Sequence, residues 1–132
     1  FLMKLGLSGA SLMAVLTSCG SSDSAAPATS ITAFSIDIST STYAALQNVG
    51  GYVKVGSVII ARTASAAASS SFAAIARICP HEKKDKMIYN SSSARFVCTE
   101  HQWYFKTSGS GDGNASTTGF SVSLTGNTLT VS

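Results

Sequence analysis

Short alternating patterns of apolar and polar residues run along most of the chain from residue 31 onward. Apolar side chains recur at about every second position in short segments, and Gly, Asn or Ser bounds these segments. A period of two places every other side chain on one face of a β-strand. The pattern therefore predicts strands at 31–38, 52–55, 57–62, 72–78, 86–90, 94–98, 120–126 and 128–132.

The segments between the predicted strands indicate tight turns and loops. The sequence Gly-Asn-Thr at 126–128, where the last two predicted strands meet, favours a hairpin. Residues 63–71 are Ala and Ser with one Thr and predict a loop, and residues 42–50 have room for one helical turn. Because no longer amphipathic helix follows, the chain is predicted to be all-β, with antiparallel strands.

Length and composition exclude some classes of protein. A chain of 132 residues is enough for one domain with a modest core. Charged residues make up 11% of it and the net charge is +3, so the chain lacks the strong basic field of a nucleic-acid-binding protein. Ala, Ser, Thr and Gly with scattered Val, Ile and Phe suit short strands better than helices.

Residues 1–18 have the pattern of a secretory signal peptide. Lys4 precedes an apolar run at 5–16, and small residues follow up to Cys19. The sequence Leu-Thr-Ser-Cys at 16–19 also resembles a bacterial lipobox, which implies that Cys19 becomes the acylated first residue of a mature lipoprotein. The alternative is an uncleaved membrane-spanning helix, although residues 5–16 fall short of the ~20 residues that a span needs.

Residues 19–30 are small, mostly polar and without a repeating pattern, which predicts a flexible tether between the lipid anchor and a domain at 31–132. The alternative is a spacer without functional consequence. Because the sequence begins with Phe1, we expect it to be a fragment. Phe-Leu at 1–2, followed by Lys4, resembles the end of a twin-arginine signal, and this resemblance implies paired arginines upstream.

Two stretches near the middle of the chain each pair a cysteine with a histidine. One residue separates Cys79 from His81, two separate Cys98 from His101, and sixteen lie between His81 and Cys98. Thiolates and imidazoles are metal ligands, and two predicted strands between the loops would bring all four together. One alternative is two buried cysteines with two solvated histidines. Another is tetrahedral zinc, although paired zinc ligands are usually two to four residues apart.

At these residues the chain resembles the Rieske iron–sulfur family, whose motif is C-x-H, then some fifteen to seventeen residues, then C-x-x-H. The resemblance extends over about residues 43–132. It implies an antiparallel β-sandwich with a small cluster-binding subdomain at about 78–106. It also implies a [2Fe-2S] cluster, with Cys79 and Cys98 on the inner iron and His81 and His101 on the outer one.

The residues beside the two boxes are closer to those of oxygenase-type Rieske domains and ferredoxins. Quinol-oxidising members carry a disulfide between the boxes, and Lys84 and Glu100 stand at those positions. Trp103 and Phe105 replace a serine and a tyrosine whose hydroxyls raise the potential, which implies a potential toward the lower part of the family range. Gln102 stands where glycine is usual, and a glycine with positive φ is costly to replace.

The resemblance implies one-electron transfer by an exported protein, lipid-anchored on the outer or periplasmic side of the membrane. Its partner would be a redox protein or a membrane complex. The chain is not a complete oxygenase, because both histidines are used and no nucleophile–base pair stands out. One alternative is a zinc-stabilised structural or binding lipoprotein of the cell envelope. A narrower one is a Rieske subunit of a quinol- or oxyanion-oxidising complex.

Overall fold

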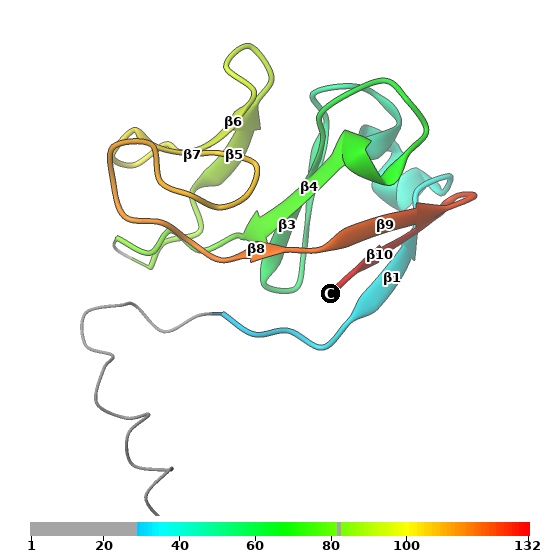
Figure 1. Cartoon of the computed structure of the whole chain (residues 1–132), viewed down its shortest axis with the longest axis horizontal. Coiled ribbons are helices and arrows are strands. Elements are labelled where there is room, and N and C mark those ends of the chain that lie inside the picture. Colours follow the sequence, from blue (N-terminus) through cyan, green and yellow to red (C-terminus); the bar gives the residue numbers. More distant parts are fainter. Residues whose placement is uncertain (1–28, 82) are drawn as a thin grey trace, which may run out of the picture.

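The computed structural model describes residues 29–81 and 83–132. The predicted signal peptide, Cys19 and the tether up to residue 28 lie outside the described residues. In the described part the chain forms ten β-strands and two short 3-10 helices, η1 (Ser41–Gln47) and η2 (Ser69–Ser71) (Figure 1). No helix within these residues has the length and apolar character needed to span a membrane.

The strands form three antiparallel sheets. The first sheet joins β1 (Phe34–Asp37), β10 (Thr128–Val131) and β9 (Val122–Thr125) in that order. The second joins β2 (Tyr52–Val55), β3 (Val58–Arg62), β4 (Phe72–Ala76) and β8 (Gly119–Phe120). The third joins β5 (Met87–Asn90), β6 (Arg95–Cys98) and β7 (Trp103–Phe105). The predicted all-β class is therefore confirmed.

The second sheet is central and has a hydrophobic core on each face. Along β3, Ile59 and Ala61 join the core shared with the third sheet, whereas Val58 and Ile60 join the core shared with the first sheet. A strand buried on both faces needs a continuous apolar run, which explains the sequence Val-Ile-Ile-Ala at 58–61. Full burial of each isoleucine contributes roughly 1.5–3 kcal/mol to folding.

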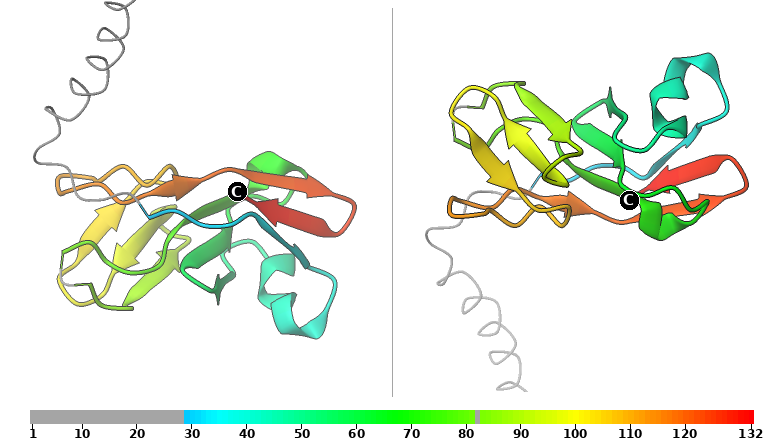
Figure 2. Two further views of the ribbon diagram at one scale, coloured as in Figure 1. Left: turned by 90° about the horizontal axis from the view of Figure 1, so that it is seen from below. Right: turned by 90° about the horizontal axis from the view of Figure 1, so that it is seen from above.

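The third sheet and its loops form a lobe at one end of the molecule, which we call the small lobe (residues 78–112). The first two sheets form the body beside it, as the two further views show (Figure 2). The core between the second and third sheets contains Cys79 and Cys98. The two cysteines therefore lie at the junction of the small lobe with the body.

Seven of the eight predicted segments each contain one observed strand, and residues 42–50 contain most of η1. The exception is the predicted strand at 120–126, which the structure divides between two strands. β8 ends at Phe120 and belongs to the second sheet, whereas β9 begins at Val122 and belongs to the first sheet. Ser121 lies between them and pairs with the last residue of the chain through two backbone hydrogen bonds of 2.8 and 3.0 Å. Strand β7 was not predicted.

Candidate metal centre

The two Cys/His boxes fold into turns of the same kind. In the first, the backbone N–H of Lys83 donates to the carbonyl of Cys79 at 2.8 Å, and in the second the N–H of Gln102 donates to the carbonyl of Cys98 at 2.9 Å. The backbone N–H of Cys79 donates to the carbonyl of Lys84 at 2.9 Å, while Cys98 pairs with Trp103 between β6 and β7. Each cysteine thus begins a five-residue turn, and the fifth residue closes the turn by donating its N–H to the carbonyl of the cysteine.

Both turns end on a residue in the left-handed region of the backbone map. Lys83 has φ +56° and Gln102 has φ +58°. This conformation costs an ordinary L-residue roughly 1–2 kcal/mol, and glycine adopts it without that cost. Gln102 therefore keeps the backbone that the family glycine would supply and bears the strain itself.

The two histidines occupy different positions in turns of the same kind. Counting from the cysteine, His81 is the third residue of its turn, and His101 is the fourth residue of the other. The two imidazoles nevertheless meet, because their ring centroids are 4.6 Å apart and the rings are nearly perpendicular, at 86°. The structure therefore brings together the two histidines that the sequence singled out.

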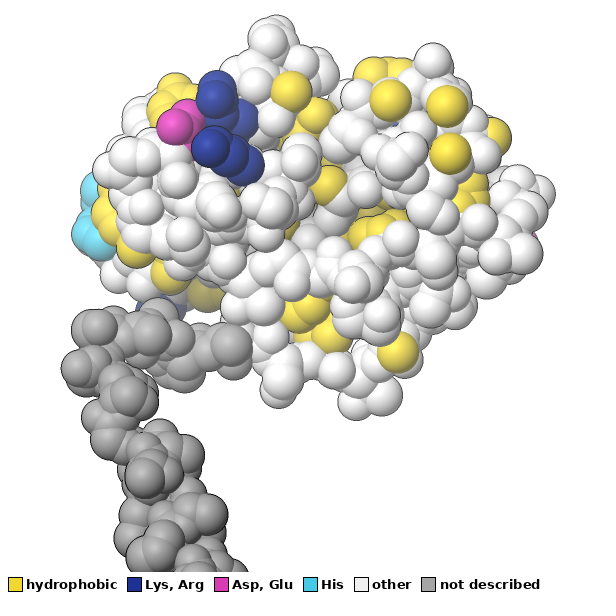
Figure 3. Space-filling model, viewed as in Figure 1, with side chains coloured by type: hydrophobic (Ala, Val, Ile, Leu, Met, Phe, Trp, Pro, Cys, Tyr) yellow, Lys and Arg dark blue, Asp and Glu magenta, His cyan; other side chains and the backbone are white. Residues whose placement is uncertain are grey.

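The cysteines and the histidines differ sharply in exposure. Cys79 and Cys98 are each 1% exposed, whereas His81 and His101 are exposed. The histidine side chains appear at the outer end of the small lobe in the space-filling view (Figure 3). The candidate ligands thus form a pair of buried thiols and a pair of surface imidazoles.

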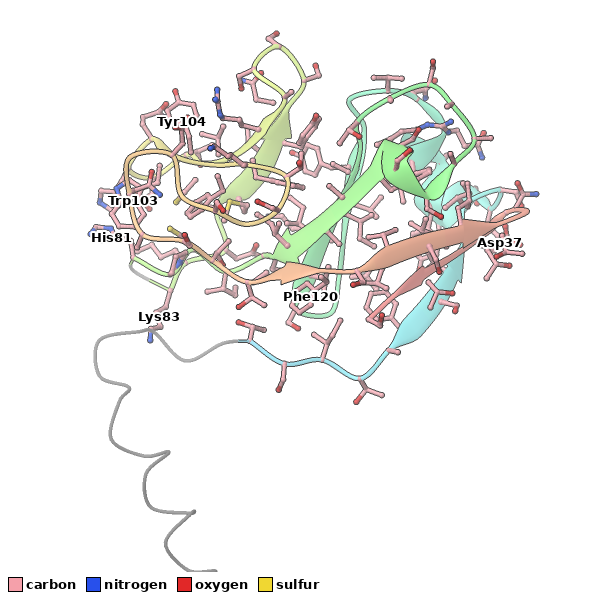
Figure 4. The ribbon with its side chains drawn as sticks, viewed as in Figure 1. Asp37, His81, Lys83, Trp103, Tyr104 and Phe120 are labelled. Atoms are coloured by element: carbon pink, nitrogen blue, oxygen red, sulfur yellow. The ribbon has the colours of Figure 1, made fainter. Side chains whose placement is uncertain are left out.

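Trp103 packs directly against one of the candidate ligands. Its ring lies 4.4 Å from the ring of His81 between centroids, tilted by 33° (Figure 4). It is partly buried, and it also packs on the core that contains both cysteines. The contact with Trp103 therefore helps to hold the imidazole of His81 in its orientation.

The first loop is fastened to the body by a carboxylate. Asp85 accepts from Nζ of Lys54 on β2 at 2.8 Å and from Nη2 of Arg77, just after β4, at 2.5 Å. The hydrogen bonds from Arg77 and Lys54 lower the pKa of Asp85 to about 2. The pKa of Asp85 in the folded protein thus lies below its ordinary value of 3.8. The contact therefore makes its full contribution to the free energy of unfolding above about pH 3.8, and this contribution is lost as the pH falls toward 2.

A second ion pair joins the two loops to each other. Nζ of Lys84 lies 3.3 Å from Oε1 of Glu100. The resemblance described in the sequence analysis implies that these two positions correspond to the disulfide of quinol-oxidising proteins. The sequence excluded a disulfide there, but it did not predict that the replacing side chains would pair.

The donor types and their arrangement fit a centre with two metal ions. A tetrahedral zinc site gathers four ligands on one ion, whereas a [2Fe-2S] centre with mixed ligands takes two cysteines on one iron and two histidines on the other. The buried thiol pair and the exposed imidazole pair have the two-and-two division that the binuclear centre requires.

Comparison with known proteins gives a family. The family model described as the Rieske [2Fe-2S] domain matches residues 40–121, which is more than half of the chain and includes both boxes. No curated protein and no solved structure matches at a significant level. The chain therefore belongs to the Rieske [2Fe-2S] domain family and binds a [2Fe-2S] cluster.

Proposed function

We propose that the chain is a one-electron carrier whose cluster is held by Cys79 and Cys98 on one iron and by His81 and His101 on the other. The observation that carries this proposal is the 4.6 Å contact between the two imidazoles at the surface, with the two cysteines buried in the core of the same lobe. The cluster supplies a site that gains or loses one electron. The chain supplies its insulation, its ligands and a surface for exchange.

The environments of the two ligand pairs support different tasks. Burial of the thiols excludes water and protects the sulfur ligands from exchange and oxidation. The exposed imidazoles give a partner protein close approach to the centre without any opening of the lobe. His81 is also packed against Trp103, which restricts rotation of its ring. A rigid ligand pair keeps the structural change on electron transfer small.

The partner on this proposal is a redox protein or a membrane complex that docks at the histidine edge of the small lobe. The narrower alternative, a subunit of a quinol- or oxyanion-oxidising complex, uses the same edge. The residues that resemble those of oxygenase-type domains and ferredoxins favour the simple carrier.

Elemental analysis of the purified protein tests the cofactor. We expect iron and acid-labile sulfide in equal amounts, together with visible absorbance that bleaches on reduction, because the paired boxes supply two cysteines and two histidines. The competing hypothesis is the zinc-stabilised lipoprotein. One zinc per chain with no labile sulfide, in protein purified under anaerobic conditions, would establish that hypothesis instead.

We further propose that the protein is exported and anchored to the membrane by lipid on Cys19, with residues 19–30 as the tether. The support is the sequence alone: an apolar run at 5–16 followed by Leu-Thr-Ser-Cys. In cells given labelled fatty acid, we expect label on the full-length protein and its loss in Cys19→Ala. Ser21→Ala, two residues away, is the control and should keep the label. Equal labelling of both variants would contradict the anchor.

A further inference from the structure

The two ligand loops come from different parts of the fold, so their relative position depends on contacts between them. The first loop follows β4 and is fastened to the body through Asp85. The second is the turn between β6 and β7. A backbone hydrogen bond of 3.0 Å, from the N–H of Thr99 to the carbonyl of Lys86, joins them at their base. Nearer the histidines, side chains of the two loops meet in the contact between the rings of His81 and His101 and in the Lys84–Glu100 ion pair.

We infer that the Lys84–Glu100 pair is an electrostatic clip that keeps the two loops closed over the metal centre, in the place where related proteins carry a covalent link. Glu100 directly precedes His101, and Lys84 follows His81 by three residues. A displacement of one loop from the other at these residues therefore moves one histidine away from the other. This inference rests on the proposed role of the histidines as ligands.

The ion pair and a disulfide would be broken by different conditions. The side chains of Lys84 and Glu100 are 48% and 34% exposed, so solvent and salt reach the pair. The Debye length falls from about 8 Å at physiological ionic strength to about 3 Å at 1 M salt, which screens exposed charge pairs. We therefore expect loss of the cluster to accelerate at high salt and to be insensitive to thiol reductants, the reverse of what a disulfide would give.

The decisive experiment reverses the charge of each residue singly and then of both together. The measurement is the rate at which visible absorbance is lost in the presence of an iron chelator. Glu100→Lys should speed the loss roughly two- to fivefold at low salt, the range expected for an exposed ion pair. Lys84→Glu should do the same. The double variant Lys84→Glu with Glu100→Lys restores the attraction and should return the rate to within about twofold of the parent.

A second ion pair in the same lobe provides the matched control. Nε of Arg95 lies 2.9 Å from Oδ2 of Asp112, and the two side chains are 38% and 41% exposed. Arg95 is on β6 and Asp112 follows β7, so this pair does not join the two ligand loops. Asp112→Lys removes a pair of similar exposure. We expect it to leave the rate of cluster loss unchanged.

Amide hydrogen exchange gives a readout that does not depend on the cluster. The N–H groups of Lys83 and Gln102 close the two turns, and their exchange in cluster-free protein should be faster in Glu100→Gln than in the parent. If Glu100→Lys and Lys84→Glu each lose the cluster at the parent rate and exchange in Glu100→Gln is unchanged, the clip is refuted while the carrier proposal stands. If the parent itself holds no iron, the ligand assignment fails first.

Discussion

Replacing Cys98 by serine should leave the protein folded but colourless. Cys98 is 1% exposed and lies in the core between the small lobe and the body, where its thiolate is the proposed anchor of the inner iron. Serine is a harder and far more weakly acidic donor, so it replaces a thiolate poorly at an iron–sulfur centre. Cys79→Ser should have the same effect. The measurement is iron content per chain together with visible absorbance, and we expect both to fall close to zero.

A neighbouring residue separates loss of the ligand from damage to the core. Val97 precedes Cys98 on β6 and is 4% exposed. Val97→Thr introduces a hydroxyl at a buried position of the same strand without removing a ligand, so it should destabilise the fold modestly and keep its iron. Circular dichroism would confirm that all three variants fold. A folded Cys98→Ser protein with full iron content would rule out Cys98 as a ligand.

Replacing His81 or His101 by cysteine should lower the reduction potential by a part of the roughly hundreds of millivolts that separate centres with two histidines from those with four cysteines, because one of the two histidines remains. A thiolate adds negative charge next to the cluster, and added negative charge disfavours a further electron. Both histidines are exposed, so the substituted side chain needs no new space in the core. Protein-film voltammetry and the electron paramagnetic resonance spectrum of the reduced protein would measure the change.

The control for this prediction is a cysteine placed in the same loop but away from the ligand positions. Thr99 is exposed and lies between Cys98 and His101 in the sequence. Thr99→Cys adds a thiol to the loop without replacing an imidazole, and it should shift the potential by far less than His101→Cys. If His101→Cys and Thr99→Cys had the same potential as the parent, His101 would not be a ligand.

Most strands could be predicted from the sequence because their signal is local. In 52–55 the predicted bounds coincide with those of β2, and in 128–132 they exceed β10 by one residue. Strand β7 was missed because its three residues, 103–105, are all aromatic and show no alternation. It is a strand only because Trp103 and Phe105 pair with Cys98 and Phe96 on β6.

Within the candidate site, too, some features follow from local sequence and others only from the folded structure. The ligand types and their spacing are readable in the chain, because C-x-H and C-x-x-H are contiguous. Gln102 stands where the resemblance implies a glycine, which left the backbone of this loop open, and the structure shows that Gln102 adopts a positive φ. What the spacing did not reveal is that both boxes form one kind of turn, since this depends on which N–H closes on which carbonyl.

The sequence by itself determined the all-β class, the position of most strands and the four candidate ligands, because each depends on the order of residues over a few positions. Only the tertiary structure decided which sheet each strand joins, that Asp85 would meet Lys54 and Arg77, and that Lys84 would meet Glu100. Such contacts link residues up to 31 positions apart. Their formation depends on how the sheets pack, and no short-range pattern of apolar and polar residues encodes that.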